Sequence, residues 1–188
     1  MTTPTPLTTA EWHAWLRAYN ARLFDSADLR TAIEEDRQVI SQERLDAGWA
    51  GTEPAGEAAI VAVEERLGVR FPPTFRNFLK VSDGWEYLGP VDVFGTDEIG
   101  WLADIDGDLL EAWDLDWFQE HLAILRRCVM IAHDDGGSGC WWLLHADSVR
   151  EDGEWTAYEW WPGDGMDPEP YDDFATMVRE LTEPSSGA

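Results

Sequence analysis

The chain has 188 residues, of which 44% are hydrophobic, a composition typical of one folded domain and unlike that of a disordered segment. Its 38 Asp and Glu residues face only 13 Lys and Arg residues, so the formal net charge is −25. This charge argues against binding to nucleic acid or to anionic membrane surfaces, because both need basic contacts, and it favours a basic protein as a partner.

The N-terminal part of the chain predicts two helices. Thr8 and Glu11 match a capping box, in which each side chain accepts a hydrogen bond from the backbone N–H of the other residue. Ser26 is placed to cap a second helix. An aromatic stripe at helical spacing predicts the buried face of the first helix, with an exposed docking surface as the alternative: Trp12, Trp15, Leu16, Tyr19 and Leu23.

Two further helices are predicted before residue 80. The third runs from Glu57 to Leu67, and Gly68 suits its left-handed stop. Pro72 and Pro73 begin the fourth, because proline has no N–H to leave unpaired in the first helical turn. Turn residues follow at 82–84.

The rest of the chain shifts toward strand patterns. A helix is predicted over 114–125, with Trp117, Phe118, Leu122 and Leu125 facing inward, and a last helix over 171–181. The order of helices, antiparallel strands and a last helix indicates an α+β fold. Strands are predicted over 91–94, 99–102, 128–132, 140–145 and 155–161.

The two cysteines, Cys128 and Cys140, are too few for a disulfide framework. A hairpin turn near Gly136 would place Cys140 opposite Ala132 and Cys128 opposite Leu144, so no disulfide between the two cysteines is predicted. No apolar leader and no long apolar run is visible, and we expect a reduced, cytoplasmic protein.

The acidic residues are unevenly distributed. No Lys or Arg occurs from Val81 to Leu125, and twelve acidic residues stand between Asp83 and Glu120. One interpretation is a solvated acidic surface that reflects the proteome of origin. The other is a docking face for a basic partner.

Asp104, Asp106 and Asp108 have the spacing of the first three ligands of a calcium loop. Leu109 replaces the glycine that such a loop needs, and Leu115 replaces its bidentate acid. We therefore predict no metal site and no cofactor.

Catalysis is the least favoured class. Many carboxylates among twelve Trp residues are also typical of a carbohydrate cleft, in which two acids flank a sugar. The chain has no serine nucleophile elbow and no cofactor fingerprint. No catalytic residue is assigned.

One segment resembles a known family. Gly48–Trp85 reads GWAGTEPAGEAAIVAVEERLGVRFPPTFRNFLKVSDGW and is similar to the signature of the SUKH superfamily, the Smi/Knr-type proteins. Phe75 stands where Tyr is commoner, and Gly56 where a Ser or Thr cap is commoner. The paired strands near VMIAHDDGGSGCWWL and the helix near YDDFATMVREL extend the resemblance to about Leu181. The matching positions are Trp49, Pro54, Glu57, Glu64, Leu67, Gly68, Pro72, Pro73, Phe75, Phe78, Leu79 and Gly84.

The resemblance implies a twisted antiparallel sheet flanked by N-terminal helices and a closing C-terminal helix. It divides the chain into a helical extension (1–47), a SUKH-like domain (48–182) and a flexible tail (183–188). It also implies a non-catalytic role as a bacterial immunity protein that neutralises a toxin, often a nuclease. The alternative from the fungal relatives is an intracellular regulatory or scaffold protein without a toxin partner.

The family role and the acidic span together predict a partner-binding surface for a basic toxin or other cationic protein. Its Trp residues would be apolar anchors if they are not core residues, and Trp117 is expected in the core. The predicted contact residues are Asp97, Glu98, Trp101, Asp104, Asp106, Asp108, Glu111, Trp113, Asp114 and Asp116.

Overall fold

A computed structural model describes residues 7–35, 37, 39–134 and 139–183. The expected hairpin-turn residues 135–138, the first six residues of the chain and the last five lie outside the described residues. The helices are α1 (Thr9–Phe24), α2 (Ala27–Glu34), α3 (Gln42–Ala47), α4 (Glu57–Leu67), α5 (Pro73–Leu79), α6 (Leu102–Ile105), α7 (Gly107–Ala112), α8 (Gln119–Leu125) and α9 (Phe174–Thr182), with short 3-10 helices η1 (Asp116–Phe118) and η2 (Pro162–Asp164). The strands are β1 (Trp85–Leu88), β2 (Val91–Val93), β3 (Gly100–Trp101), β4 (Cys128–His133), β5 (Trp141–His145), β6 (Ala157–Trp160) and β7 (Glu169–Tyr171).

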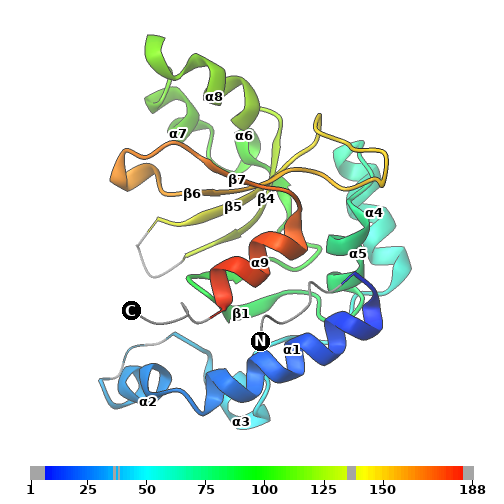
Figure 1. The fold of residues 1–188 in the computed structure, drawn as a ribbon, viewed down its shortest axis with the longest axis vertical. Helices are drawn as coiled ribbons and strands as arrows, with labels where there is room; N and C mark the ends of the chain where they lie inside the picture. The colour runs from blue at the N-terminus through cyan, green and yellow to red at the C-terminus, as the bar shows by residue number, and fades with distance from the viewer. Residues whose placement is uncertain (1–6, 36, 38, 135–138, 184–188) are drawn as a thin grey trace.

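The strands form one twisted antiparallel sheet in the order β1-β2-β4-β5-β6-β7 (Figure 1). β2 pairs with the end of β4 through Val93 opposite Ala132, and β3 pairs with its beginning through Gly100 opposite Met130. β2 and β3 therefore follow one another along the same edge of β4. The helices before the sheet and α9 after it confirm the predicted α+β fold.

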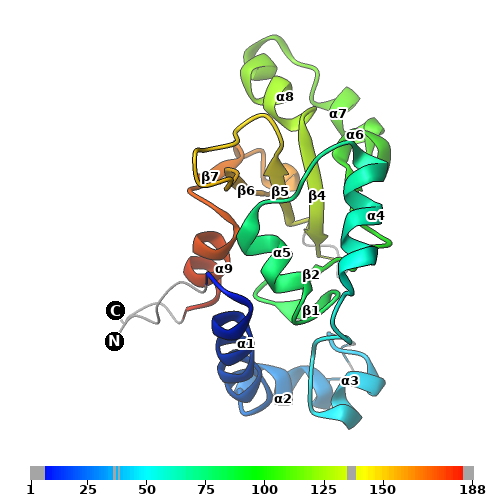
Figure 2. The same cartoon turned by 90° about the vertical axis from the view of Figure 1, so that its right-hand side faces the viewer.

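Three helices from distant parts of the chain pack together beside the sheet. Phe174 of α9 lies 5.5 Å from Trp12 of α1 and 4.9 Å from Phe75 of α5, measured between ring centroids. Phe78 of α5 completes the group at 5.3 Å from Phe174. Figure 2 shows α1, α5 and α9 next to one another. This aromatic cluster joins the two ends of the chain to the family signature.

The predicted helix starts and stops in the N-terminal half are confirmed. The capping box forms, with Glu11 N donating to Thr8 Oγ1 at 3.2 Å and Thr8 N donating to Glu11 Oε2 at 2.8 Å. α4 has the predicted bounds, and Gly68 has the left-handed φ of 68° that a glycine tolerates without strain. α5 begins at Pro73 as expected.

The aromatic stripe of α1 is buried, so the alternative of an exposed docking surface is wrong. Its members Trp12, Trp15, Leu16, Tyr19 and Leu23 are at most 7% exposed. Trp12 Nε1 donates to the Thr74 carbonyl at 2.9 Å, and Tyr19 Oη donates to the Tyr87 carbonyl at 2.9 Å. α1 thus shares a core with later segments of the chain. The predicted division into a helical extension and a SUKH-like domain at residue 48 stays a prediction.

Two regions differ from the sequence-based expectation. Residues 85–88, where no strand was predicted, form β1 and pair with β2. The strand expected over 99–102 is cut to Gly100–Trp101, because Leu102 already begins α6. Leu102 and Leu110 are buried, and they hold the unpredicted helices α6 and α7 against the protein.

The helix expected over 114–125 is broken, and Trp117 faces solvent instead of the core. The 3-10 helix η1 precedes α8, and its three residues per turn shift the phase of the side chains. Phe118 therefore takes the inward position and is fully buried, as are Leu122 and Leu125. Trp117 is 65% exposed.

The hairpin of β4 and β5 forms with a register different from the expected one. Cys128 lies opposite His145 instead of Leu144, and Ala132 opposite Trp142 instead of Cys140. The register also shifts by one residue between Met130 and Ala132. Cys128 and Cys140 are both buried and free, and burial raises the pKa of each thiol.

A buried carboxylate joins the β5–β6 loop to the first turn of α5, and its removal tests that contact. Glu154 accepts hydrogen bonds from Thr74 N and Thr74 Oγ1, both at 2.8 Å. We expect Glu154→Ala to lower the free energy of unfolding by about 2–3 kcal/mol, because two buried donors lose their acceptor. Urea denaturation measures this. Glu151→Ala is the control, since Glu151 is exposed and makes no hydrogen bond or ion pair with the described residues.

The same carboxylate gives this comparison a pH dependence. Burial raises the pKa of Glu154 above its ordinary value, so the folded state binds its proton more tightly than the unfolded state. The stability advantage of the wild type over Glu154→Ala is therefore largest at acid pH and shrinks as the pH rises through the folded-state pKa. An advantage that grows with pH in the same range would contradict this assignment.

The broken helix predicts unequal costs for two adjacent aromatic residues. Phe118→Ala leaves a cavity against Trp113 and Trp160, and we expect it to lower the free energy of unfolding by about 3–5 kcal/mol. Trp117→Ala removes a mostly exposed ring and should cost about 1 kcal/mol or less. Chemical denaturation of both variants measures the difference. Equal losses in the free energy of unfolding would contradict the break in the helix.

Candidate protein-binding surface

The later part of the acidic span, from Leu102 onward, folds into a helical cap at one end of the sheet. α6, α7 and α8 lie together there, as Figures 1 and 2 both show, and η1 leads directly into α8. Asp106 caps α7, since its Oδ1 accepts a hydrogen bond from Leu109 N at 3.1 Å. Leu110 of α7 and Leu122 of α8 are buried beneath the cap. The buried side chains leave the polar residues of these short helices pointing outward.

Most carboxylates of the predicted site are exposed, and Asp106 is half-buried. Asp114 is paired, because its Oδ2 lies 3.3 Å from Arg126 and its Oδ1 accepts from Gln119 at 2.6 Å. Five carboxylates on the cap are without a side-chain hydrogen bond or ion pair to any described residue: Asp104, Asp108, Glu111, Asp116 and Glu120.

Among the basic residues that follow the cap in sequence, Arg126 pairs with Asp114, but Arg127 and Arg150 do not neutralise the cap. Arg127 forms a two-pronged ion pair with Asp147, with both N–O distances at 2.8 Å. The hydrogen bond from Arg127 lowers the pKa of Asp147. Arg150 is engaged by Asp152 at 3.2 Å and Asp173 at 3.4 Å. The carboxylates on the cap therefore produce a local negative potential that is not compensated by these arginines.

Of the tryptophans considered as anchors, Trp113 and Trp117 come together, and Trp101 lies elsewhere. The rings of Trp113 and Trp117 are 5.9 Å apart, and Trp113 packs against Trp160 of β6 at 5.7 Å. Trp101 instead lies under the guanidinium of Arg127, 5.0 Å from its ring centre. The strand register places Trp101 on the same sheet face as Val129, the face opposite Trp160.

Asp97 and Glu98 occupy a turn that is fixed beside α4. Arg66 of α4 donates to the Ile99 carbonyl at 2.8 Å, and Asp83 accepts from Thr96 N at 2.7 Å. Both carboxylates are exposed. The ten predicted residues therefore divide into the cap, this turn and Trp101.

Exposed apolar side chains lie among the carboxylates of the cap, and the sequence analysis did not identify them. Ile105 is 43% exposed, Leu115 40% and Trp117 65%. Apolar side chains in the middle of a polar exposed surface are typical of the centre of a protein interface. A sequence signal was present, because all three stand among the acidic residues, but their exposure depends on the phase of each short helix.

The β6–β7 loop packs against the cap, a contact that no local sequence pattern predicted. Trp160 Nε1 donates to the Met166 carbonyl at 3.1 Å, and His121 of α8 lies 3.5 Å from Asp167. Met166 is 63% exposed. A pocket of about 250 Å³ opens in this loop, with Trp161 and Met166 beside four carboxylates: Glu159, Asp164, Asp167 and Glu169.

The aspartates at calcium-loop spacing do not form a loop. Asp104 lies in α6, Asp106 caps α7 and Asp108 lies within α7, so helical geometry separates their carboxylates. Within the described part of the chain, no three His, Cys, Asp or Glu side chains are grouped to hold a metal ion. The described helices include none with the length and apolar character needed to cross a bilayer.

Comparison with known proteins agrees with the architecture. The model of the SMI1 / KNR4 family (SUKH-1) matches residues 54–180, which is more than half of the chain and runs from just before α4 into α9. No curated protein matches the chain. The match begins at Pro54, near the start of the signature segment, and includes the α4–α5 unit and the whole sheet. The chain therefore belongs to the SMI1 / KNR4 family (SUKH-1).

Proposed function

We propose that this protein is a cytoplasmic immunity protein that binds a basic, nuclease-type toxin and blocks its active cleft without catalysis. Membership of the family is consistent with this role. The observation that carries the proposal is the cap, where unpaired carboxylates surround exposed apolar side chains. A nuclease cleft is basic because it holds phosphates, so a cap of this charge suits it.

The contact surface has a defined arrangement in this proposal. Trp117, supported by Trp113, is the apolar anchor at its centre. The unpaired carboxylates of the cap surround the anchor and direct the approach of the partner. Asp106 and Asp114 hold the cap in shape, while Asp97, Glu98 and Trp101 can contact only a partner that extends beyond it.

Co-expression with toxins encoded beside this gene tests the proposal directly. We expect the protein to restore growth to cells that produce its cognate toxin, because the bound cap excludes substrate from the cleft. Colony counts with and without the protein measure the rescue. Failure against every neighbouring toxin, together with stable capture of a housekeeping enzyme in pull-downs, would favour a regulatory role instead.

Charge reversal on the cap tests its part in recognition. We expect Asp104→Lys, Asp108→Lys and Glu111→Lys together to lower kon for the toxin about tenfold or more at low salt, and to weaken its salt dependence. Stopped-flow fluorescence over a range of salt concentrations measures both quantities.

A control with the same change in net charge separates local from global effects. Glu34, Glu65 and Glu151 are exposed and lie outside the cap, and their carboxylates form no hydrogen bond or ion pair with the described residues. Their combined reversal to Lys should change kon by less than about threefold, since steering is strongest near the contact surface. Equal slowing by both triple variants would show that only net charge matters and would remove the cap from the interface.

A further inference from the structure

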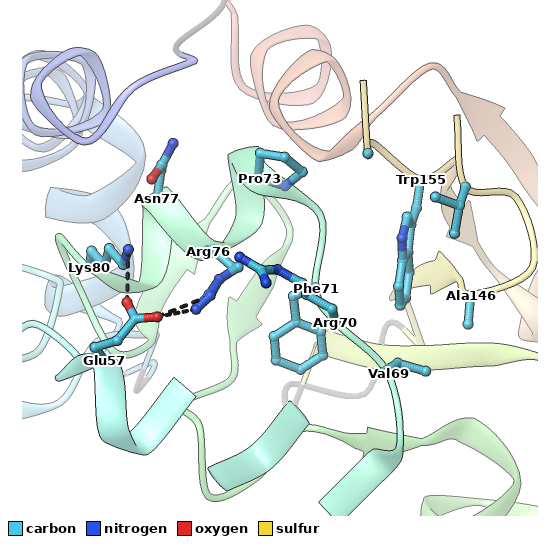
Figure 3. A pocket seen from close by; sticks show the side chains of 12 residues that line it. Glu57, Val69, Arg70, Phe71, Pro73, Arg76, Asn77, Lys80, Ala146 and Trp155 are labelled. Carbon is cyan, nitrogen blue, oxygen red and sulfur yellow. Dashed lines mark hydrogen bonds and ion pairs between the residues drawn. The ribbon is translucent and has the colours of Figure 1, made fainter. Parts of the chain in front are cut away.

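A pocket with basic side chains lies away from the acidic cap. It has a volume of about 530 Å³ and opens between the α4–α5 loop, α5 and the β5–β6 loop (Figure 3). Three of the 13 Lys and Arg residues of this acidic chain line it: Arg70, Arg76 and Lys80. None of the residues predicted for partner binding lines this pocket.

Two of these three cations are balanced by carboxylates. Glu57 pairs with both Arg76 and Lys80, with 2.9 Å between Lys80 Nζ and Glu57 Oε2, as the dashed lines in Figure 3 mark. These hydrogen bonds, first from Lys80 and then from Arg76, lower the pKa of Glu57 and keep it ionised. Glu64 supplies a second carboxylate to Arg76, 3.5 Å from its Nε.

Arg70 is the uncompensated charge of the pocket. Its side chain is exposed and forms no hydrogen bond or ion pair with any residue that the structure describes. A guanidinium offers a planar fork of donors that matches a carboxylate or phosphate group in a two-pronged contact. In Figure 3 the side chain of Arg70 extends across the pocket in the direction of Arg76.

The backbone on both sides of Arg70 is fixed by one buried residue. Val69 N donates to the Glu64 carbonyl at 3.1 Å, and Phe71 N donates to Glu64 Oε1 at 2.8 Å. Glu64 is only 8% exposed. Arg70 therefore extends from a rigid support, which lowers the entropy cost of ordering it on a ligand.

The rest of the pocket wall is mostly apolar and also held in place. Phe71 and Pro73 lie on one side and Trp155 of the β5–β6 loop on the other. Val149 of the same loop also lines the pocket. The hydrogen bonds from Thr74 to Glu154 tie this loop to α5. An apolar wall with a few placed polar groups, within this range of volume, is typical of sites for small molecules.

We propose that this pocket binds a small organic anion, an apolar or aromatic body that carries one carboxylate or phosphate group. Arg70 binds the anionic group, and the wall of Phe71, Val149 and Trp155 covers the body. A basic toxin does not suit this site, because Arg70 would repel it. The pocket is therefore a second site, independent of the proposed function.

Titration with simple probes tests this site. The probes are benzoate and phenyl phosphate, with benzyl alcohol as the neutral analogue and inorganic phosphate as the anion without a body. The Trp155 indole N–H signal in ¹H–¹⁵N spectra reports occupancy, and calorimetry gives Kd. We expect saturable binding of at least one aromatic anion, about tenfold or more tighter than benzyl alcohol or inorganic phosphate.

Two variants and a matched control locate the binding. Arg70→Gln should weaken the aromatic anion about tenfold or more, and Val149→Asp should weaken it as well, because it adds a carboxylate at the 59% exposed lip. Arg17→Gln is the control and should change Kd less than about twofold, since Arg17 is also exposed and unpaired among the described residues but lies on α1. Thermal unfolding of all three verifies that they fold.

Several results would overturn the assignment. One is the absence of any Trp155 shift with both aromatic anions up to about 10 mM. Another is equal affinity for benzyl alcohol, and a third is equal weakening by Arg17→Gln and Arg70→Gln. Rescue from a toxin does not depend on Arg70, so Arg70→Gln should rescue as the wild type does. The failure of one proposal is thus distinguishable from the failure of the other.

Discussion

Contact between aromatic rings from three distant segments is the interaction on which the rest of the structure depends. Phe174 lies among Trp12, Phe75 and Phe78, so one buried side chain near the C-terminus closes the core against the first helix and the signature helix. Aromatic side chains bury large apolar areas, and edge contacts between rings add to that stabilisation. This cluster leaves the opposite end of the sheet to the cap, whose helices are short.

The protein separates its charges instead of neutralising them evenly. The arginines that follow the cap in sequence are held by local carboxylates such as Asp147 and Asp152, and the carboxylates of the cap keep their negative potential. In the basic pocket, Glu57 and Glu64 compensate Arg76 and Lys80, and Arg70 forms no ion pair with any described residue. The same chain thus presents one surface suited to a cation and one pocket suited to an anion.

Elements formed by contacts between residues close in sequence were predicted correctly, and elements that depend on contacts between distant residues were missed. The capping box at Thr8, the left-handed stop at Gly68 and the start of α5 at Pro73 were predicted, because each depends on residues a few positions apart. β1 was missed because its strand state depends on pairing with β2. Trp117 was misplaced because a 3-10 turn changes the side-chain phase, and periodicity assumes an uninterrupted α-helix.

The sequence by itself determined the family, the α+β order of elements and the concentration of negative charge after residue 81, since these are properties of local pattern and composition. Only the tertiary structure decided which acidic and apolar side chains share a surface. It brought Met166 beside Trp160, placed Trp101 on the sheet face opposite Trp160 and brought Arg70 and Trp155 into the lining of one pocket. The physical reason is that exposure and proximity depend on packing between segments far apart in the chain, which no local pattern records.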